Sequence, residues 1–586
     1  MTAGWCAQVS AQALQHDITV EHDVVLQKRE ALKRALTPTV QLPPVTLPTL
    51  QVIGTGVGID LQPMGPVLGA MESDAAAPDT LHHGYAAFGY FPAYNLAGSA
   101  GYSGSAGNFS GRVWLQFDGR AFKRTNLFDE NEGTYRDNTF TLGAEGQMNT
   151  SVGRFALAAD YTGAWYNMPM YDGDEPDLKS QSASNVHVRL TFNHPSRQGG
   201  VRWNAGVAVG HFGFGKPGAL PIYIYDYVPY FPSTGANDTS AAKETNVSVS
   251  AGLSTTTSDN SSVALDATFD FQHDNHRPSF DYMYRAREYR YQPGNSESVR
   301  LLTFRPSWRT STEQFTAHIG AKVQITGGGG KVFHIAPDVL LAWTPATQFA
   351  IYGKAGGGEH LNTLESLFAD VRYIQPMMSY GISHVPLTLE AGLKAGPWSG
   401  FAIRAYAKYA KANEWLMPIV PDMAQEHPVM LGFGAVDIRG ALLGAQLSYA
   451  AGRTAEVSLG YEYSPTDPKA TRGWWEWRDR ARSQVTASAT VRPIAPLSIN
   501  ATWRFRDGRQ ILDEQVILDQ EAGVVGYDYQ RKLGSISDLS VGASWALNSD
   551  VNVWLTLENL LGRSWQQLGF VPSQGFHGLA GISCKF

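Results

Sequence analysis

From Gly84 onward, apolar and polar residues repeatedly alternate along the chain. Residues 186–193 are one example, with Val186, Val188 and Leu190 separated by polar side chains, and similar runs cover 263–272, 455–463 and 497–506. A period of two is that of a β-strand with one apolar and one polar face. Runs of this kind predict about 22 strands between Gly84 and Phe586.

The connections between these strands alternate between short and long. Short turns are expected at Thr150-Ser151, 196–199, 258–260, Pro397-Trp398, Gly452-Arg453, Ala495-Pro496 and Ser549-Asp550. Long loops are expected at 126–135, 169–181, 213–241, 276–297, 361–386, 414–434, 464–480, 507–535 and 561–576. Two connections on the long side are short, near Phe91-Pro92 and at 326–330. A soluble sandwich has no reason to sort its loops this way, whereas outer-membrane barrels have short periplasmic turns and long extracellular loops. The sequence therefore predicts an all-β, transmembrane antiparallel β-barrel with both termini periplasmic.

The polar positions of these strands are expected to face a water-filled lumen. They carry charges of both signs, which excludes a large field of one sign. The candidate lumen-facing residues are Arg189, Asp266, Asp270, Arg404, Lys408, Arg504 and Arg506. Aromatic residues near strand ends or on apolar faces are candidates for interface girdles, although ordinary strand packing also uses them. These are Trp114, Trp165, Trp203, Tyr461, Trp503 and Trp554.

The chain before Gly84 differs from the rest. Residues 1–12 resemble the remainder of a secretory signal peptide, because Val9-Ser10-Ala11 before Gln12 is similar to a cleavage site. The basic region and most of the apolar region of such a signal are missing, so a native N-terminus without an export signal is the alternative. Residues 13–83 are rich in proline, which favours extended backbone, and we expect a periplasmic extension followed by a barrel over 84–586.

Composition narrows the classes of function. Charged residues make up 17% of the chain and the net charge is −7, which gives no support for a nucleic-acid partner. Cys6 and Cys584 are the only cysteines, too few for a disulfide framework or a cysteine metal cluster. No apolar stretch approaches the roughly 18 residues of a membrane-spanning helix.

The last strand ends on an aromatic carboxyl terminus. Gly581, Cys584 and Phe586 resemble the glycine, apolar and aromatic positions of the signal that the barrel-assembly machinery reads, and Leu579 departs from it where a polar residue is usual. An ordinary terminal strand of a soluble protein is the alternative. The predicted partners are therefore the assembly machinery during biogenesis, and outer-membrane lipid and lipopolysaccharide afterwards.

The closing segment resembles the final two strands of TonB-dependent transporters. In that family a near-terminal strand ends in an Asn-Leu pair, here Asn559-Leu560, and a Pro and a Gly precede the last strand, here Pro572 and Gly575. The expected strand number extends the likeness over 84–586. The resemblance implies a receptor- or transport-related barrel in the outer membrane of a Gram-negative cell. Those transporters carry a much longer N-terminal plug domain, so we expect a plugless relative, a type associated with Bacteroidota.

A search for reaction chemistry predicts no catalytic, cofactor or metal site. A His-Glu-x-x-His motif is absent. Residues 326–331 are glycine-rich and end in Lys331, but Val332 follows where a phosphate loop needs Ser or Thr. Residues 101–105 lack the strand–turn–helix context of a hydrolase nucleophile. The chain is therefore not expected to be an enzyme.

Two aromatic segments are candidates for recognition. One is a possible extracellular binding loop for sugars, peptides or a protein, formed by Tyr223, Tyr225, Tyr227, Tyr230 and Phe231. Stacking on its own rim is the equal alternative. The other is Trp474-Trp475-Glu476-Trp477, for which a membrane-interface anchor is the alternative.

Two functions remain open. The first is passage of solutes, as a porin-like pore or an uptake receptor. The alternative is a plugless structural subunit of a complex for outer-membrane protein assembly, secretion or lipoprotein export, with a surface lipoprotein or periplasmic protein as partner. Since an open barrel of this size would leak, something must fill the lumen: inward-folded loops, residues 13–83 or a partner chain.

Overall fold

The computed structural model of the chain describes residues 83–92, 94–125, 132–172, 175–194, 200–216, 241–258, 260–274, 279–283, 288–292, 297–328, 332–373, 381–420, 432–452, 454–466, 472–517, 524–566, 568 and 572–586. The expected signal remnant and nearly all of the proline-rich extension lie outside these residues. Both stay predictions.

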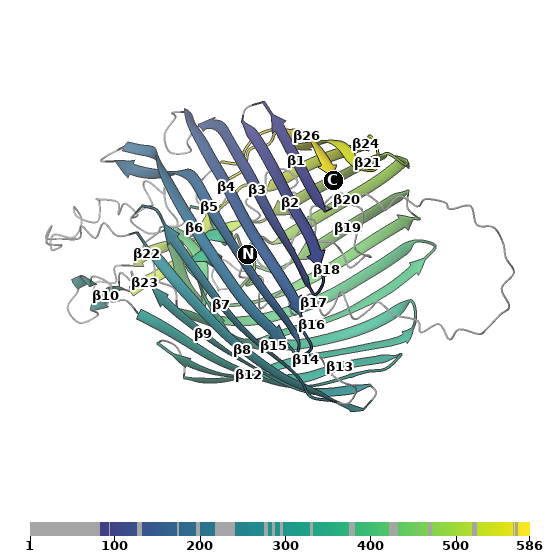
Figure 1. Cartoon of the computed structure of the whole chain (residues 1–586). Coiled ribbons are helices and arrows are strands. Elements are labelled where there is room, and N and C mark those ends of the chain that lie inside the picture. The colour runs from purple at the N-terminus through teal and green to yellow at the C-terminus, as the bar shows by residue number, and fades with distance from the viewer. Residues whose placement is uncertain are drawn as a thin grey trace.

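A closed antiparallel barrel of 22 strands forms the molecule, as the loop pattern predicted (Figure 1). Its first half consists of β1 Gly84–Phe91, β2 Asn95–Ala106, β3 Phe109–Thr125, β4 Glu132–Asn149, β5 Arg154–Asp172, β6 Glu175–Asn193, β7 Arg202–Phe214, β8 Lys243–Ser258, β9 Ser261–Asp274, β12 Glu297–Ser311 and β13 Phe315–Gly327. The second half consists of β14 Phe333–Ala346, β15 Phe349–Leu361, β16 Ile382–Trp398, β17 Phe401–Val420, β18 Gly432–Ala451, β19 Ala455–Tyr463, β20 Ser483–Ile494, β21 Leu497–Asp507, β24 Ile536–Ala546, β25 Val551–Glu558 and β26 His577–Lys585.

Five further elements of the described residues lie in long connections between barrel strands. The strands β10 Ser279–Met283 and β11 Glu288–Gln292 pair with each other, and β22 Gln510–Ile517 pairs with β23 Val524–Lys532. The short helix α3, Leu364–Asp370, follows β15. No helix in the described part of the chain is long and apolar enough to cross a bilayer.

The barrel closes by pairing its first strand with its last. Phe88 lies opposite Ile582 in the antiparallel β1–β26 register. The backbone N–H of Gly84 donates to the carbonyl oxygen of Phe586 at 2.7 Å, and the Phe586 N–H donates back to Gly84 at 2.9 Å. This pairing confirms that the terminal strand is the closing strand, joined to the one that starts at Gly84.

The outer face of the barrel is apolar. Side chains such as Leu190, Leu253, Ile319, Trp343 and Leu459 are exposed on their strands, while polar side chains alternate with them on the other face. An isolated apolar side chain costs little on a soluble protein, but a continuous apolar exterior indicates contact with lipid. The alternation of apolar and polar residues along each strand therefore reflects a barrel wall whose outer face contacts lipid.

The candidate girdle residues do not all lie on the outer face of the barrel. Trp165, Trp203 and Tyr461 are exposed on the outer face. Trp554 is instead buried on the inner face, against Ala97 and Leu579. Its ring occupies the space beside Gly581, where a Cβ would lie 2.4 Å from Trp554 Cζ2, so Gly581 also has a local packing reason to be glycine.

Trp114 also lies on the inner face. It alternates with the exposed Val113 and Leu115, and the Arg112 guanidinium carbon lies 5.0 Å from the centre of its ring. This girdle assignment was wrong as well, because period-two alternation places Trp114 opposite its apolar neighbours.

The prediction of a long loop at 169–181 is wrong. The strands β5 and β6 continue through it, with Met170 paired to Asp177 and Tyr171 to Pro176. Pro, Asp and Gly in this stretch favour a turn, but strands that project beyond the bilayer need no apolar outer face. The alternation signal therefore ends before the strands do. The strand β17 likewise continues to Val420, inside the loop expected at 414–434.

Candidate functional site

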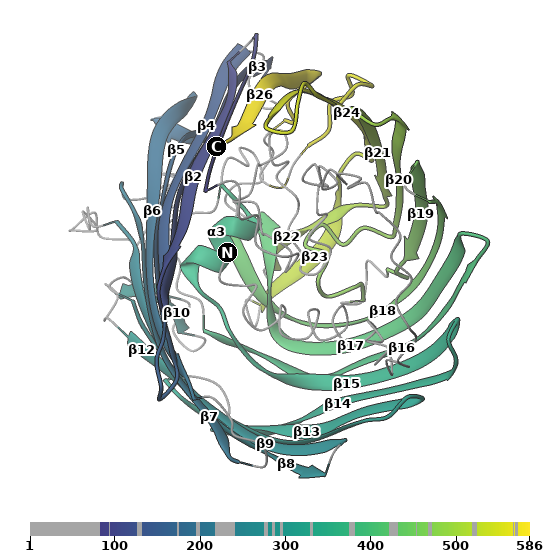
Figure 2. The ribbon, with the colours of Figure 1, turned by 45° about the vertical axis from the view of Figure 1, so that its right-hand side comes forward.

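Figure 2 shows α3 and the hairpin β22–β23 inside the ring of barrel strands. The connections that carry them, together with residues 464–482, pack against the inner wall and form a cap across the lumen. The cap consists of the described parts of residues 362–373 with α3, residues 464–482, and residues 508–535 with the hairpin β22–β23. Its main apolar core joins opposite walls, because it combines side chains of β4, β5 and β7 with others of β17 and β18. The core consists of Tyr135, Ala164, Tyr166, Ala183, Phe212, Phe214, Ala242, Leu364, Leu367, Phe368, Val371, Tyr373, Leu416, Phe433, Ile511, Leu533 and Leu568. Of the three expected ways to fill the lumen, inward-folded loops are the one that the described residues display.

The helix α3 is too short to persist by itself and depends on the packing of one face. Thr363 caps its N-terminus, since the Thr363 hydroxyl accepts from the Ser366 N–H and the Ser366 hydroxyl accepts from the Thr363 N–H. The apolar face points into the core, where the ring of Phe368 lies 5.4 Å from that of Phe212. Isolated helices of this length are unstable in water, so the wall of the barrel supplies the stability.

The polar side of α3 is bound to the strands behind it. Glu365 Oε2 lies 3.0 Å from His187 Nε2 on β6, and the Asn185 amide also donates to Glu365. On β8, Glu244 accepts from the backbone N–H of Leu364 at 2.9 Å. These contacts fix the start of the helix to the wall.

Arg372 fixes the other end of the same segment. Its guanidinium donates to Asp137 at 2.5 Å and to Thr139 at 2.9 Å, both on β4. It also lies over the rings of Phe368 and Tyr166, at 4.6 and 5.1 Å from their centres. A desolvated guanidinium between a carboxylate and aromatic faces is a favourable arrangement for a buried cation.

The Trp474-Trp475-Glu476-Trp477 segment packs inside the barrel. Trp474 is 4% exposed and Trp477 is 8% exposed, and they pack against inward side chains of β17 and β18. The segment is therefore neither a surface recognition loop nor a membrane anchor, and both interpretations from the sequence were wrong. The lumen is a third environment that accommodates tryptophan.

A close backbone contact seats this segment on β18. A Cβ on Gly440 would lie 1.8 Å from the carbonyl oxygen of Gly473. The Gly473 N–H donates to the Arg439 carbonyl at 3.2 Å. Only glycine at position 440 permits this approach.

Buried ion pairs join the three pieces of the cap. Arg478 donates to Asp370 at 2.5 Å, which connects the tryptophan segment to α3, and it also donates to the carbonyl oxygen of Leu416. Burial raises the pKa of the Asp370 carboxyl, and the Arg478 charge opposes that rise.

A second group of buried charges joins the segment 474–479 to the connections 508–535 and 561–576. Asp479 lies 2.7 Å from Arg509 and 3.2 Å from Arg506, and the side chains of Asp479 and Arg509 are 0% exposed. Arg509 also donates to the carbonyl oxygens of Gly534 and Gln566, at 2.9 and 3.0 Å. Burial alone would raise the pKa of Asp479, but the two guanidinium groups outweigh it and hold that pKa below its usual value.

The residues predicted to line the lumen lie on several separate strands. Arg404 and Lys408 lie 3.7 and 4.0 Å from Glu390 on the wall, and Arg506 joins the Asp479 group. The remaining four, Arg189, Asp266, Asp270 and Arg504, alternate with apolar residues of the outer face. Of these seven, the structure thus brings Arg506 and Lys408 against the cap, since Lys408 Nζ lies 5.9 Å from the centre of the Trp474 ring.

The other sequence candidates have different outcomes. The tyrosine-rich loop with Tyr223 to Phe231 lies outside the described residues. Gly581 and Cys584 lie on β26 and Phe586 follows it, while their role as an assembly signal stays a prediction.

Sequence reasoning missed α3 and the buried ion pairs. A signal for α3 was present, because Leu364, Leu367 and Phe368 follow Thr363 at helical spacing inside an expected long loop. The pairs Arg478–Asp370 and Arg509–Asp479 had no such signal, since their partners are far apart in the chain.

The strand number, the closure and the apolar exterior define the chain as a transmembrane β-barrel of the outer-membrane type. No protein-family model and no curated protein matches it. Solved structures do, and their fold is that of the TonB-dependent outer-membrane receptors.

Three of these structures illustrate the likeness. The FrpB iron transporter from Neisseria meningitidis has a TM-score of 0.61 at 14% identity, covering 86% of this chain and 81% of that one. The ferric enterobactin receptor PfeA from Pseudomonas aeruginosa gives 0.59 at 10% identity, covering 86% and 80%. The ferripyoverdine receptor of the same organism gives 0.56 at 12% identity, covering 86% and 72%. At these identities the likeness concerns the fold.

Proposed function

We propose that this protein is a gated outer-membrane barrel, receptor- or transport-related and without catalysis, whose cap moves to admit a solute. The observation that carries the proposal is the cap itself, whose apolar core joins β4, β5 and β7 to β17 and β18 across the lumen. The shared fold with an iron transporter and two ferric-siderophore receptors supports uptake as the purpose of the barrel.

The contacts within the cap suit a gate with two discrete states. Opening separates charges that are buried when the cap is closed, among them Arg372 from Asp137 and Arg478 from Asp370. A buried charge that loses its partner is strongly destabilised, so partial opening is unfavourable unless water or a solute replaces the lost contacts. A polar solute with hydrogen-bonding groups would lower the cost of opening.

The partners follow from the location. Outer-membrane lipid and lipopolysaccharide would surround the apolar exterior, and the barrel-assembly machinery would insert the chain. A surface lipoprotein or a periplasmic protein would bind only if the barrel also served as a scaffold. The candidate binding loop with Tyr223 to Phe231 lies outside the described residues, and transport is the proposal that the cap supports.

Solute release from proteoliposomes tests the proposal. In one variant a glycine-serine linker replaces residues 364–372, and in the control variant a similar linker replaces the β10–β11 hairpin, whose two strands pair with each other. We expect small polar solutes to pass through the cap variant and not through the control or the unmodified chain. Each variant is first shown to contain a folded barrel by its resistance to unfolding in detergent when the sample is not heated. A folded cap variant that releases no more solute than the control would overturn the proposal.

A further inference from the structure

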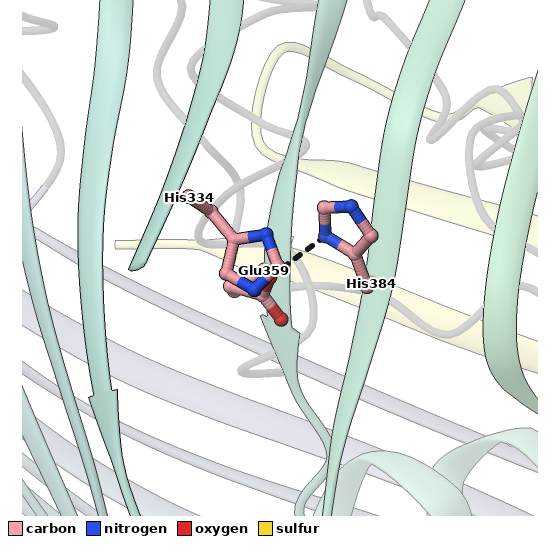
Figure 3. A group of neighbouring side chains, drawn as sticks. All are labelled: His334, Glu359 and His384. Atoms are coloured by element: carbon pink, nitrogen blue, oxygen red, sulfur yellow. Dashed lines mark ion pairs between the residues drawn. The ribbon is translucent and has the colours of Figure 1, made fainter. Parts of the chain in front are cut away.

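Two imidazoles and one carboxylate meet at the outer end of β14, β15 and β16 (Figure 3). His334 Nε2 and His384 Nδ1 each lie 2.7 Å from the same oxygen, Oε1 of Glu359. The two imidazole rings are 4.1 Å apart between centres. The side chains of His334, Glu359 and His384 are 7%, 2% and 20% exposed.

The strands hold these side chains in place. Glu359 and His384 are direct partners in the β15–β16 register. His334 lies between the exposed Phe333 and Ile335, which places it on the inner face of the wall. The backbone N–H of Glu359 donates to the Gln324 side chain on β13 at 2.7 Å, and this bond holds the backbone at residue 359.

This set of donors has the chemistry of a transition-metal site. Two histidines and one glutamate bind Zn²⁺ in known proteins, and imidazole also suits Ni²⁺, Cu²⁺ and Fe²⁺. An ion at about 2.1 Å from each donor separates neighbouring donors by roughly 3.0 to 3.4 Å. The two N···O separations of 2.7 Å need to widen by only a few tenths of an ångström, which small side-chain rotations supply. Binding requires neutral imidazoles and an ionised carboxylate, so the ion would displace any proton on these three donor atoms.

The position of the three residues connects them to the cap. Glu359 comes three residues before Asn362, and His384 comes three residues after Gly381, so they flank the connection that carries α3. The Asn362 side chain donates to the Gly381 carbonyl at 2.8 Å and already draws the two ends together. An ion bound to both strands and to His334 would fasten the base of this connection to β14.

We propose that His334, Glu359 and His384 bind one divalent transition-metal ion, and that this ion clamps the base of the cap. The binding site stands independently of the proposed function, whereas the clamp rests on it. A metal bound here would act on the base of the connection that carries α3, outside the apolar core of the cap.

Metal analysis of the full chain tests the site. The protein is purified in detergent, stripped with a chelator, dialysed against Zn²⁺ and measured by plasma mass spectrometry and calorimetry. We expect one tightly bound ion per chain, and at least about tenfold weaker binding in Glu359→Gln and His384→Ala, since even outer-shell changes cost 10- to 100-fold. The control is His318→Ala, which removes a histidine paired with Asp338 on the neighbouring strands.

The folded state of each variant is verified by its heat-dependent mobility in detergent. Glu359→Gln keeps the shape of the side chain, so it reports on the ligand and not on packing. Absence of a stoichiometric ion in the unmodified chain overturns the site. Binding by folded Glu359→Gln that equals that of His318→Ala overturns it as well.

Solute release tests the clamp. We expect a chelator to raise release through the unmodified chain and Zn²⁺ to reverse this, with neither reagent affecting Glu359→Gln. Stoichiometric binding without any change in release would overturn the clamp. Failure of the linker variant to release solute would instead count against the gate, and the metal analysis would still decide the site.

Discussion

Replacing Arg509 with methionine is expected to open the cap. The guanidinium of Arg509 is fully buried, and the change removes its contact with Asp479 and its hydrogen bonds to the carbonyl oxygens of Gly534 and Gln566. Methionine fills much of the same space, so the loss is mainly electrostatic. Breaking one side of a buried ion pair typically costs about 3–5 kcal/mol. Asp479 keeps Arg506 at 3.2 Å, which places the expected loss near the lower end, about 3 kcal/mol.

Single-channel recording in planar bilayers measures this change directly. Because about 1.4 kcal/mol corresponds to a tenfold change in an equilibrium, the ratio of open to closed cap should rise roughly 100-fold. We expect the unmodified protein to show almost no channel openings and the Arg509→Met variant to open frequently.

The matched control makes the same substitution at an exposed pair. Arg112 lies 2.7 Å from Glu145, but the two side chains are 35% and 42% exposed. Exposed pairs contribute at most about 1 kcal/mol, so Arg112→Met should change the open ratio by less than about fivefold. If folded Arg509→Met opened no more often than Arg112→Met, the ion-pair group would not hold the cap closed.

Three further outcomes follow from the same contacts. Phe368→Ala should cost the closed cap about 3–5 kcal/mol through lost core packing, with Phe155→Ala on the outer wall as a control, and an unchanged open probability would contradict the packing role. Gly440→Ala should displace the tryptophan segment, because the new Cβ would meet the Gly473 carbonyl, and a red-shifted tryptophan emission would report it, whereas an unaltered spectrum would mean that the backbone adjusts. Although burial opposes it, the charges of Arg506 and Arg509 hold the pKa of Asp479 low, so its stabilising effect is complete above about pH 4 and is lost as the pH falls through the lowered value. Channel recordings below about pH 4 should show opening that increases as the pH falls, whereas Asp479→Asn, which lacks the charge at every pH, should open frequently throughout that range.

The wall of the barrel could be predicted from the sequence because lipid imposes a local rule. Each strand must alternate while it crosses the bilayer, so Val186, Val188 and Leu190 indicate a strand without knowledge of its neighbours. The rule ends where the lipid ends, and this is why residues 169–181 were predicted as a loop although β5 and β6 continue through them.

The cap could not be predicted in the same way, because its contacts are not local. Asp370 and Arg478 are 108 positions apart in the chain, and nothing in either neighbourhood indicates the other. Trp474 and Trp477 were interpreted as surface or interface residues, since a loop beside a bilayer normally offers only those two environments. The three residues of the proposed metal site are each 25 positions apart, at 334, 359 and 384, a spacing set by strand and connection lengths and not by a motif.

The cap core also connects parts of the chain that are far apart in sequence. The core combines Tyr135 near the start of the barrel with Leu568 just before its last strand. Contacts between such distant parts of a chain form late, because the loop-closure entropy between them must be overcome first. The core also includes side chains of the wall itself, such as Phe212 on β7 and Phe433 on β18, so a complete cap core requires these strands to be in place. A break in the wall on either side of the lumen would therefore also remove part of the cap.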